Sequence, residues 1–380
     1  MSRQTLGEAC SRLSSGKSIP SNKVLDKGLY PVIGGNGRRG FTNSYNFEGR
    51  CAVIGRQGAA CGNVHYFSGK GYMTEHAVVA CAANGNDSHY LAYLLSTMNL
   101  GRLSGQSAQP GLSVRTLSKQ FIDLPSLKKQ RQVVELLGSL DEKIGVNTRA
   151  NGYLAEIAEG IFEDWLHTAG GDSVPLSRIA SFNPSTYATK EKWPTVVYID
   201  TGSVTRNHFE DPVVINTAIE KLPSRARRKV ENGDVLYSTV RPNQLHYGLM
   251  NNPPSNLLVS TGFTVVRDKA GVGGPFIYLA LTRPSITEML QSVAEQSTSA
   301  YPSIKSSDLG QIEIPEPTKE ELGKIKPQLD NLFELIAQNE RESRALRELR
   351  DALLPKLMSG EIDVSQIGLP TQPNSHLCER

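Results

Sequence analysis

Gly35, Gly37 and Gly40 give the chain a literal match to the G-x-G-x-x-G fingerprint of dinucleotide-binding proteins, inside the run IGGNGRRGFT. In that motif a strand leads into the glycines and a helix begins within them, because helix N–H groups hold the pyrophosphate. The preceding YPVI reads as a strand, but the following FTNSYNFEGR reads as turns. We therefore predict a hairpin-rich β region whose glycines permit turns, rather than a site for NAD, FAD or S-adenosylmethionine.

Two other short motifs suggest chemistry that their neighbours do not support. SGKS at 15–18 resembles the end of an ATP-binding phosphate loop, but Ser11 stands where the first glycine of that loop is required. NPPS at 252–255 resembles the Asn-Pro-Pro-aromatic motif of DNA adenine methyltransferases, whose aromatic ring stacks on a flipped base. Ser255 cannot stack in this way, so we interpret NNPPS as a turn.

The remaining reactive residue types form no recognisable catalytic or metal site. The seven histidines are scattered, and the five cysteines are odd in number with no C-x-x-C pair, which favours neither zinc nor a disulfide framework. Glu75 and His76 could act as a base and its orienting group, although a satisfied histidine at a strand start is the interpretation we favour. No G-x-S-x-G sequence occurs. The chain gives no positive evidence of a catalytic centre.

Length and composition indicate a soluble protein of two domains. The 380 residues are enough for two cores, and 38% hydrophobic content is ordinary. No apolar run approaches the roughly 18 residues of a membrane span, and MSRQTLGEACSRLSSG lacks the apolar core of a signal peptide. We therefore expect a cytoplasmic location.

The net charge of +3 is unevenly distributed along the chain. Segment 1–125 carries +7 and segment 126–170 carries −2. Segment 171–315 carries +1 and segment 316–380 carries −3. A basic N-terminal part fits a polyanionic partner, although charge alone does not establish nucleic-acid binding.

The second half of the chain repeats the first. FIDLPSLKKQ at 121–130 matches QIEIPEPTKE at 311–320, and Ser113-Val114-Arg115 matches Ser303-Ile304-Lys305 at the same offset of 190. AVIGR, ending at Arg56, matches YSTVR, ending at Arg241, and the segment 74–79 matches 259–264 at the same offset of 185. The repeat is divergent, as expected of two copies of one architecture with different targets.

Each half ends in a segment of heptad-spaced apolar residues with asparagine near its middle, which is typical of a coiled-coil seam. Two unrelated amphipathic helices on separate cores are the alternative. We predict two long helices packed antiparallel, with a mixed α/β domain at each end and a pseudo-twofold axis between the copies. The predicted interface residues are Val133, Leu137, Leu140, Ile144, Asn147 and Asn151 in the first helix, and Leu322, Ile325, Leu329, Leu332, Ile336 and Asn339 in the second.

These features together resemble the specificity subunits of Type I restriction–modification systems. Four runs carry the resemblance: YPVIGGNGRRGFTNSYNFEGRCAVIGRQG with its continuation to Val79, SAQPGLSVRTL, IDLPSLKKQRQVVELLGSLDEKIGVN and LRELRDALLPKLMSGEIDV. It covers nearly the whole chain and is weaker across 172–300. It implies the following division: target-recognition domain 1 at 1–125, a central spacer helix at 126–170, target-recognition domain 2 at 171–315, a distal spacer helix at 316–360 and a tail at 361–380.

Membership of that family implies a non-catalytic subunit that reads a split DNA site, with helices that set the gap between the half-sites. It also implies two partner modification subunits that methylate adenine at N6, and it permits restriction (translocase–endonuclease) subunits. S-adenosylmethionine, ATP and Mg²⁺ are then expected on those partners, with no cofactor or metal on this chain. Because the two domains differ in sequence, we expect an asymmetric DNA site.

Basic and amide side chains in loops are the candidate DNA contacts, because arginine pairs with guanine and asparagine or glutamine with adenine. Arg56 and Arg241 lead, because they are predicted to follow matching strands. The first-domain candidates are Arg38, Arg39, Arg56, Gln57, Asn63, Lys70, Gln106 and Gln109, and the second-domain candidates are Arg206, Arg225, Arg227, Arg228, Arg241, Asn243, Gln244 and Lys305.

Two other functions remain open at the level of the residues. The first is a nuclease or methyltransferase with built-in recognition, which would need a cofactor motif. The second is a coiled-coil scaffold that joins proteins without reading DNA, against which the basic first segment argues. Salt-dependent DNA binding by the assembled complex would separate a scaffold from a DNA-reading subunit.

Overall fold

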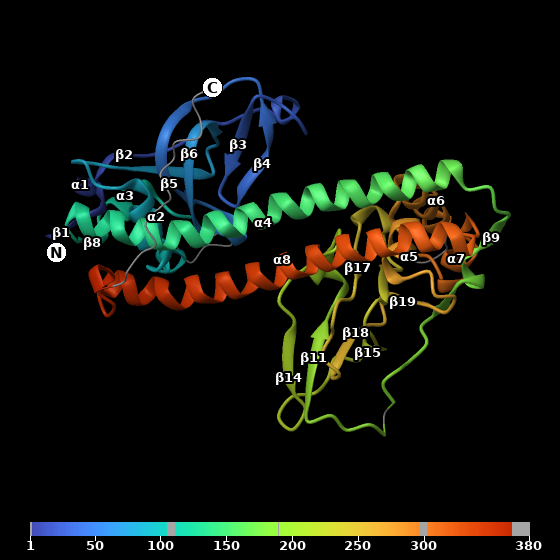
Figure 1. Ribbon diagram of the computed structural model, residues 1–380. Helices are drawn as coiled ribbons and strands as arrows, with labels where there is room; N and C mark the ends of the chain where they lie inside the picture. The colour runs from blue at the N-terminus through green and yellow to red at the C-terminus, as the bar shows by residue number, and fades with distance from the viewer. Residues whose placement is uncertain (1, 105–110, 189, 297–301, 367–380) are drawn as a thin grey trace. The chain divides into compact units, whose positions relative to one another are not determined.

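The structure is a computed structural model that describes residues 2–104, 111–188, 190–296 and 302–366 (Figure 1). The chain divides into a first unit, Met1–Val146 with Glu342–Arg380, and a second unit, Asn147–Arg341. Two long helices, α4 (Leu127–Thr168) and α8 (Lys319–Ser359), contribute to both units. The compact units therefore combine residues that are distant in sequence, unlike the linear segments predicted above.

A six-stranded sheet forms the body of the first unit, and its neighbouring strands are antiparallel except for β3 beside β6. In order across the sheet these are β2 (Cys10–Ser15), β7 (Ala77–Ala82), β5 (Phe47–Gly55), β6 (Val64–Met73), β3 (Tyr30–Gly34) and β4 (Gly37–Thr42). The other elements are β1 (Ser2–Thr5), paired with β8 (Phe121–Leu124), and helices α1 (Leu6–Ala9), α2 (Ser88–Ser96) and α3 (Val114–Ser118).

The inner strands β5 and β7 are apolar at consecutive positions because each face of the sheet covers a core. Ile54 and Val78 belong to a cluster that includes side chains of α2. Val53 and Val79 belong to a separate cluster with Met73. Since side chains alternate between the faces of a strand, the runs AVIG (52–55) and AVVA (77–80) are buried throughout.

The second unit contains two four-stranded sheets. The first comprises β10 (Ala180–Phe182), β19 (Phe263–Asp268), β16 (Val235–Ser238) and β17 (Tyr247–Leu249), and the other comprises β14 (Val213–Asn216), β11 (Thr195–Ile199), β18 (Leu257–Ser260) and β15 (Ala226–Lys229). Two small pairs are β9 (Ser173–Pro175) with β20 (Glu313–Pro315) and β12 (Val204–Thr205) with β13 (His208–Phe209), and the short helices are α5 (Gly274–Thr282), α6 (Pro284–Glu295) and α7 (Ser306–Gly310).

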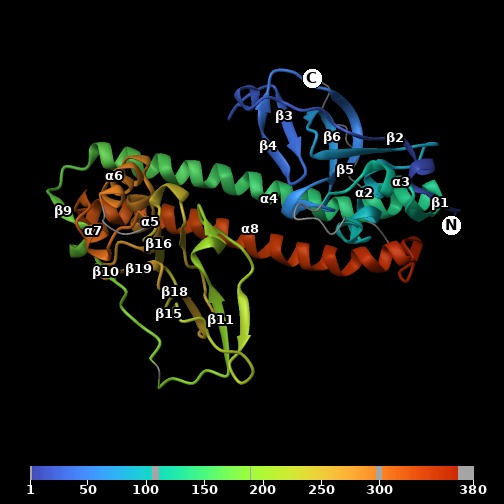
Figure 2. The ribbon, with the colours of Figure 1, turned by 180° about the vertical axis from the view of Figure 1, so that it is seen from behind.

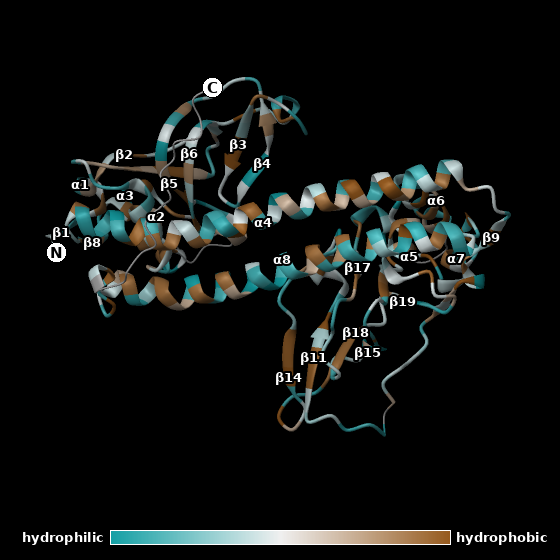
Figure 3. Cartoon of the chain, in the orientation of Figure 1, coloured by the Kyte–Doolittle hydropathy of each residue, from teal (hydrophilic) through white to brown (hydrophobic). Residues whose placement is uncertain are grey.

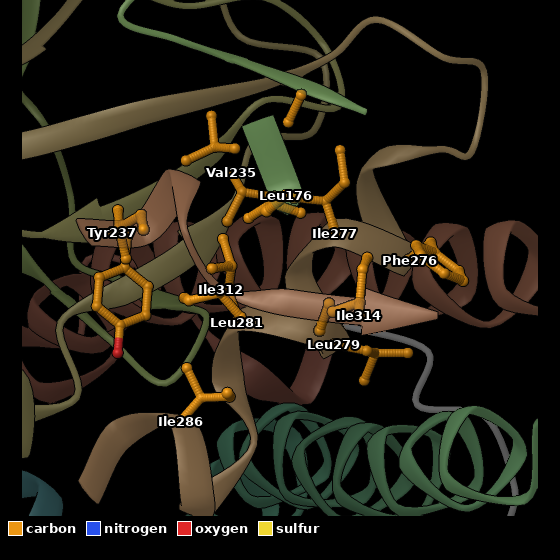
Figure 4. Packing of buried hydrophobic residues seen from close by; sticks show 14 of the residues in the cluster. Leu176, Val235, Tyr237, Phe276, Ile277, Leu279, Leu281, Ile286, Ile312 and Ile314 are labelled. Atoms are coloured by element: carbon orange, nitrogen blue, oxygen red, sulfur yellow. The ribbon is translucent and has the colours of Figure 1, made fainter. Parts of the chain in front are cut away.

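The main core of the second unit lies between the sheet β10-β19-β16-β17 and the helices that pack on it, including α5 and α6. Figure 4 shows Val235 of β16, Phe276 and Ile277 of α5 and Ile314 of β20 packed together. Phe162 of α4 belongs to the same cluster, so a long helix is part of this core.

The predicted internal repeat is confirmed by strand order, because β2-β7-β5-β6 in the first unit recurs as β10-β19-β16-β17 in the second. Backbone hydrogen bonds also fix its register. Leu6 N donates to Gln120 O at 2.7 Å, and Leu176 N donates to Ile312 O at 2.8 Å. The offset here is therefore 192, so the predicted matches at an offset of 190, including FIDLPSLKKQ with QIEIPEPTKE, are wrong by two residues.

The two long helices run antiparallel within each unit, as predicted, and lie side by side in both views (Figures 1 and 2). In the second unit Asn339 Nδ2 donates to Asn151 Oδ1 at 2.8 Å, and Asn151 Nδ2 donates to Ile336 O at 3.2 Å. Asn147 Nδ2 donates to Asn339 O at 3.4 Å. In the first unit Lys143 pairs with Glu342 at 3.1 Å. The bonds made by the asparagines are directional and favour one register of the helix pair.

The predicted interface residues of the helices are buried or half-buried without exception. Val133 and Leu137 belong to the core of the first unit, and Ile325 and Leu329 belong to that of the second. The apolar spacing therefore joins each helix end to a sheet domain as well as to the other helix. Figure 3 shows apolar residues recurring along both helices. In the part of the chain that the structure describes, no helix is long and apolar enough to cross a membrane.

Candidate nucleic-acid interface

A cluster of loops lies at one end of β5 in the first unit. Arg56 N donates to His76 O at 2.9 Å, and Leu112 N donates to Arg56 O at 2.8 Å. Gly55 N donates to Asn63 O at 2.8 Å, which closes the loop 55–63. Main-chain bonds therefore hold the segments around 56, 76 and 112 together. We call this group the first loop cluster.

The glycine-rich motif belongs to this cluster and forms a hairpin rather than the start of a helix. Gly34 pairs with Gly37, so Gly35 and Asn36 make the turn between β3 and β4. A Cβ at Gly35 would lie 3.0 Å from His76 O and 3.1 Å from the Cα of Gly55. The glycines thus allow close approach of backbones and a positive φ of 93° at Gly37, as expected from the sequence.

The motif SGKS also owes its glycine to backbone contact. A Cβ on Gly16 would lie 2.2 Å from Met73 O. Lys17 N donates to the same carbonyl oxygen at 2.9 Å. The segment 15–18 therefore packs against Met73, three residues before His76 of the first loop cluster.

Four of the first-domain candidates gather at the first loop cluster. Arg56 is half-buried, with Nε donating to Leu112 O at 3.3 Å, while Gln57 is exposed and bridges to Gly111. Asn63 is exposed at the end of the same loop, and the Arg39 side chain lies over Gly34. The cluster offers guanidinium and amide donors on a surface rimmed by main-chain turns.

Two of the other first-domain candidates, Arg38 and Lys70, make contacts with aromatic or acidic side chains. Arg38 stacks its guanidinium on the ring of Phe41, with 5.0 Å from Cζ to the ring centroid. Lys70 lies on β6, three residues before its last residue Met73, and pairs with Glu48 of β5 at 3.6 Å. There the carboxylate of Glu48, and then Tyr45, raise the pKa of Lys70. Gln106 and Gln109 lie outside the described residues.

A second loop cluster occupies the corresponding place in the second unit. Thr239 N donates to Gly262 O at 2.8 Å, and Ile304 N donates to Thr239 O at 2.9 Å. These bonds repeat those made by Arg56 with His76 and Leu112. Thr239, and not Arg241, is therefore the equivalent of Arg56, and the predicted match of AVIGR with YSTVR is wrong by two residues. The segment match at 185 is also wrong by one residue, because Gly262 corresponds to His76.

Arg241 nonetheless lies in this cluster, two residues further on. Its backbone has a positive φ of 49°, and its N–H donates to Pro302 O at 3.0 Å. Asn243 N donates to Gln291 Oε1 at 3.2 Å. The exposed candidates that this cluster brings together are Arg225, Arg241, Asn243, Gln244 and Lys305.

Arg206 lies next to a cavity of the second unit. It forms the turn between β12 and β13 and lines a cavity of about 800 Å³ together with Glu159 and Tyr278. Burial, and then Glu156 and Glu163, raise the pKa of Glu159, and the charge of Arg206 opposes that rise. Arg206 therefore interacts electrostatically with Glu159 of α4 and with Tyr247 and Tyr278.

The basic run RARRK at 225–229 is only partly available for phosphate. Lys229 Nζ lies 2.5 Å from Glu191 Oε2 and stacks on Trp193. Arg227 and Arg228 are half-buried on β15, and Arg227 Nε donates to Ser224 O at 3.4 Å. Arg225 is the exposed member.

The structure adds residues that sequence reasoning missed. Asn36 is exposed at the hairpin turn of the first cluster, where an Asn-Gly turn signal in the sequence could have identified it. Thr239 has no such signal, because its position depends on strand register. Among the described residues no group of three or more His, Cys, Asp or Glu side chains could hold a metal ion. The arrangement suits hydrogen bonding to phosphates and base edges.

Comparisons with known proteins point to one family. Residues 4–154 match the family described as the Type I restriction modification DNA specificity domain. The chain is 36% identical over 143 residues to the Type I restriction enzyme EcoprrI specificity subunit from Escherichia coli, which is 37% of this chain and 35% of that protein. It is 31% identical over 192 residues to the HindI specificity subunit from Haemophilus influenzae, which is 50% of this chain and 40% of that protein. The chain thus matches less than half the length of either relative.

Among solved structures, the S subunit of a Type I restriction–modification system from M. genitalium is similar in fold. Its TM-score is 0.61 at 15% sequence identity, and the alignment covers 94% of this chain and 95% of that chain.

Proposed function

We propose that the chain is a specificity subunit of a Type I restriction–modification system and reads DNA for a complex whose other subunits do the chemistry. The match of residues 4–154 to the specificity-domain family and the similarity to two specificity subunits support this proposal. The first loop cluster reads one half-site and the second loop cluster reads the other. Modification subunits that dock on this chain use S-adenosylmethionine to methylate adenine at N6. Restriction subunits, where they join, use ATP and Mg²⁺. The chain itself is non-catalytic, binds no cofactor and works in the cytoplasm.

The observation that carries this proposal is a repeated backbone with different side chains. The two clusters share main-chain hydrogen bonds, yet Arg56 and Gln57 of the first are replaced by Thr239 and Val240 in the second. Donor groups at equivalent positions therefore differ, which supports an asymmetric, non-palindromic site.

The test is methyl transfer by purified proteins. The chain, co-expressed with its modification subunit, is expected to transfer methyl groups from S-adenosylmethionine to adenine N6 at one split DNA motif. Binding of this complex to that motif should weaken as the salt concentration rises. The chain alone is expected to transfer none. Methyl transfer by the chain alone, or a complex that methylates without sequence preference, would contradict the proposal.

Replacement of a base-reading arginine should affect one half-site only. In the complex we expect Arg56→Ala to relax base preference in one half and Arg241→Ala to relax it in the other, by about 1–3 kcal/mol each. Methylation of a randomised half-site library measures both. Lys70→Ala is the control, because the Lys70 ammonium pairs with Glu48 at 3.6 Å and lies over the ring of Tyr45. Equal changes in both halves from either variant would show that the assignment of that arginine is wrong.

A further inference from the structure

Three polar side chains join helix α2 of the first unit to both long helices. Tyr93 Oη of α2 donates to Asp141 Oδ2 of α4 at 2.5 Å. Arg350 Nη1 of α8 donates to Asp141 Oδ1 at 2.8 Å, and Arg350 also pairs with Asp351 at 2.8 Å. One carboxylate therefore accepts from the sheet domain and from the second helix at once. We call Tyr93, Asp141 and Arg350 the polar clamp.

The polar clamp is partly sheltered from water. Tyr93 is 8% exposed, and the side chains of Arg350 and Asp141 are 28% and 34% exposed. Burial, and then the hydrogen bond to Asp141, raise the pKa of the Tyr93 hydroxyl. Burial alone would lower the pKa of Arg350, but the bonds to Asp141 and Asp351 outweigh it and the pKa is raised. Charge-assisted bonds in such surroundings are strong and directional.

A stack of rings connects the polar clamp to the sheet. The His89 ring lies 3.8 Å from that of Tyr66 on β6 and 4.6 Å from that of Tyr93, nearly parallel to the first. Burial lowers the pKa of His89, although Asp87 and Asp141 oppose this, and the neutral ring is favoured. Strand β6 begins directly after the loop 55–63, so the stack and the clamp link the first loop cluster to the helices.

The second unit has no polar clamp at the corresponding positions. Helices α4 and α8 begin 192 residues apart, and Leu91 and Ile277 make equivalent first bonds in α2 and α5, 186 residues apart. These offsets convert Tyr93, Asp141 and Arg350 into the residues Leu279, Phe333 and Ala158. All three are buried in the apolar core of the second unit.

A half-buried polar contact at this position therefore needs a reason beyond stability. In the second unit, apolar side chains make the contact at the equivalent positions. Apolar replacements of buried ion pairs are often as stable as the pair itself. Polar contacts of this kind are best known for fixing one register among several. Arg350 stands between Leu346 and Leu353 in α8, where the heptad spacing calls for an apolar residue. Apolar packing does not explain an arginine at this position.

We propose that the polar clamp is a positioning device that fixes the first recognition domain in one place on the helix pair, and thereby sets the permitted spacing between half-sites. This inference rests on the proposed function. Tyr93, Asp141 and Arg350 touch no DNA in this account. Their directional bonds allow the domain one position along the helices, whereas a purely apolar contact would also allow neighbouring positions.

The test is a DNA library in which the half-sites keep their sequence and the gap between them varies base pair by base pair. The complex with modification subunits is expected to methylate one gap length. Tyr93→Phe and Arg350→Met should lower the preference for that gap over its neighbours by about tenfold each, the scale of a lost charge-assisted bond. Base preference in each half-site should stay the same. The double variant should lose little more than either single variant, because both remove one network.

Lys143→Met is the matched control, since Lys143 joins the same two helices to Glu342 through an exposed pair with side chains 49% and 45% exposed. It should leave the gap preference unchanged. The triple variant Tyr93→Leu, Asp141→Phe, Arg350→Ala copies the second unit and covers the case in which single variants fail to fold.

Folded single or triple variants with the gap preference of the original complex would overturn the inference while leaving the proposed function standing. A loss of base preference without any change in gap preference would also overturn it, because the residues would then support the loops and not the spacing. An original complex that methylates no split motif would overturn the proposed function itself.

Discussion

Asp234→Ala is expected to destabilise the second unit by about 3–5 kcal/mol, because it leaves a largely buried arginine without its carboxylate. Asp234 is 1% exposed and accepts from Arg267 Nε and Nη2, each at 2.8 Å. It also accepts from Glu231 N at 2.7 Å. The bonds to Asp234 raise the pKa of Arg267. The guanidinium remains charged when they are removed, because the ordinary pKa of arginine lies far above neutral.

Hydrogen exchange followed by mass spectrometry measures this loss where it occurs. Amides of β16 and β19 should exchange at least a hundredfold faster in Asp234→Ala, since about 1.4 kcal/mol corresponds to tenfold. Glu231→Ala is the matched control. It removes a 68% exposed partner of the same arginine and should change stability by at most about 1 kcal/mol. Equal effects of the two variants would refute the importance of the buried pair.

Gly55→Ala is expected to disrupt the first loop cluster and to abolish recognition of one half-site. A Cβ on Gly55 would lie 2.0 Å from Ala60 O and 2.7 Å from Gly35 O, and both are backbone atoms that cannot rotate away. Loop 55–63 and the hairpin turn must therefore separate, at about 1–3 kcal/mol for an overpacked site. Binding of single half-site duplexes by the complex would reveal the loss.

Gly111→Ala supplies the control for this prediction. Gly111 bridges to Gln57 in the same loop cluster, but an added Cβ would meet nothing within 4 Å. This variant should bind both half-sites normally. If Gly55→Ala also binds both half-sites normally, then the close backbone approach does not organise the first loop cluster.

The glycine motif was predictable because its neighbours decide its meaning. A helix was excluded by the turn residues after Gly40, and the structure has strand β4 (Gly37–Thr42) there. The contact of Gly35 with Gly55 and His76 was beyond sequence reasoning, since it joins three segments that are distant in the chain.

The repeat was predicted, but not its register. Short motifs such as AVIGR and YSTVR can slide by two residues and still look alike, whereas hydrogen bonds cannot. This is why Arg56 was matched with Arg241 when Thr239 is its equivalent. The second unit also contains the sheet β14-β11-β18-β15, whose strands lie between the matched segments and change their spacing.

The long helices were the most predictable part. Their apolar spacing persists over many turns, and Asn147, Asn151 and Asn339 were predicted at the interface of the helices, where they bond to one another. What spacing could not reveal is how each helix end joins a core, or why Arg350 stands in the seam. Its partner Asp141 is 209 residues away in the chain.

The most direct test of DNA reading by this chain is the adenine methylome of its host, compared with and without the gene. We predict that N6-methyladenine disappears from one split, asymmetric motif when the gene is deleted. We also predict that it returns when the gene is restored, and that the gene with Arg56→Ala restores it with relaxed preference in one half of the motif. A motif that remains fully methylated in the deletion strain, in a host where the modification subunit is expressed, would contradict the account.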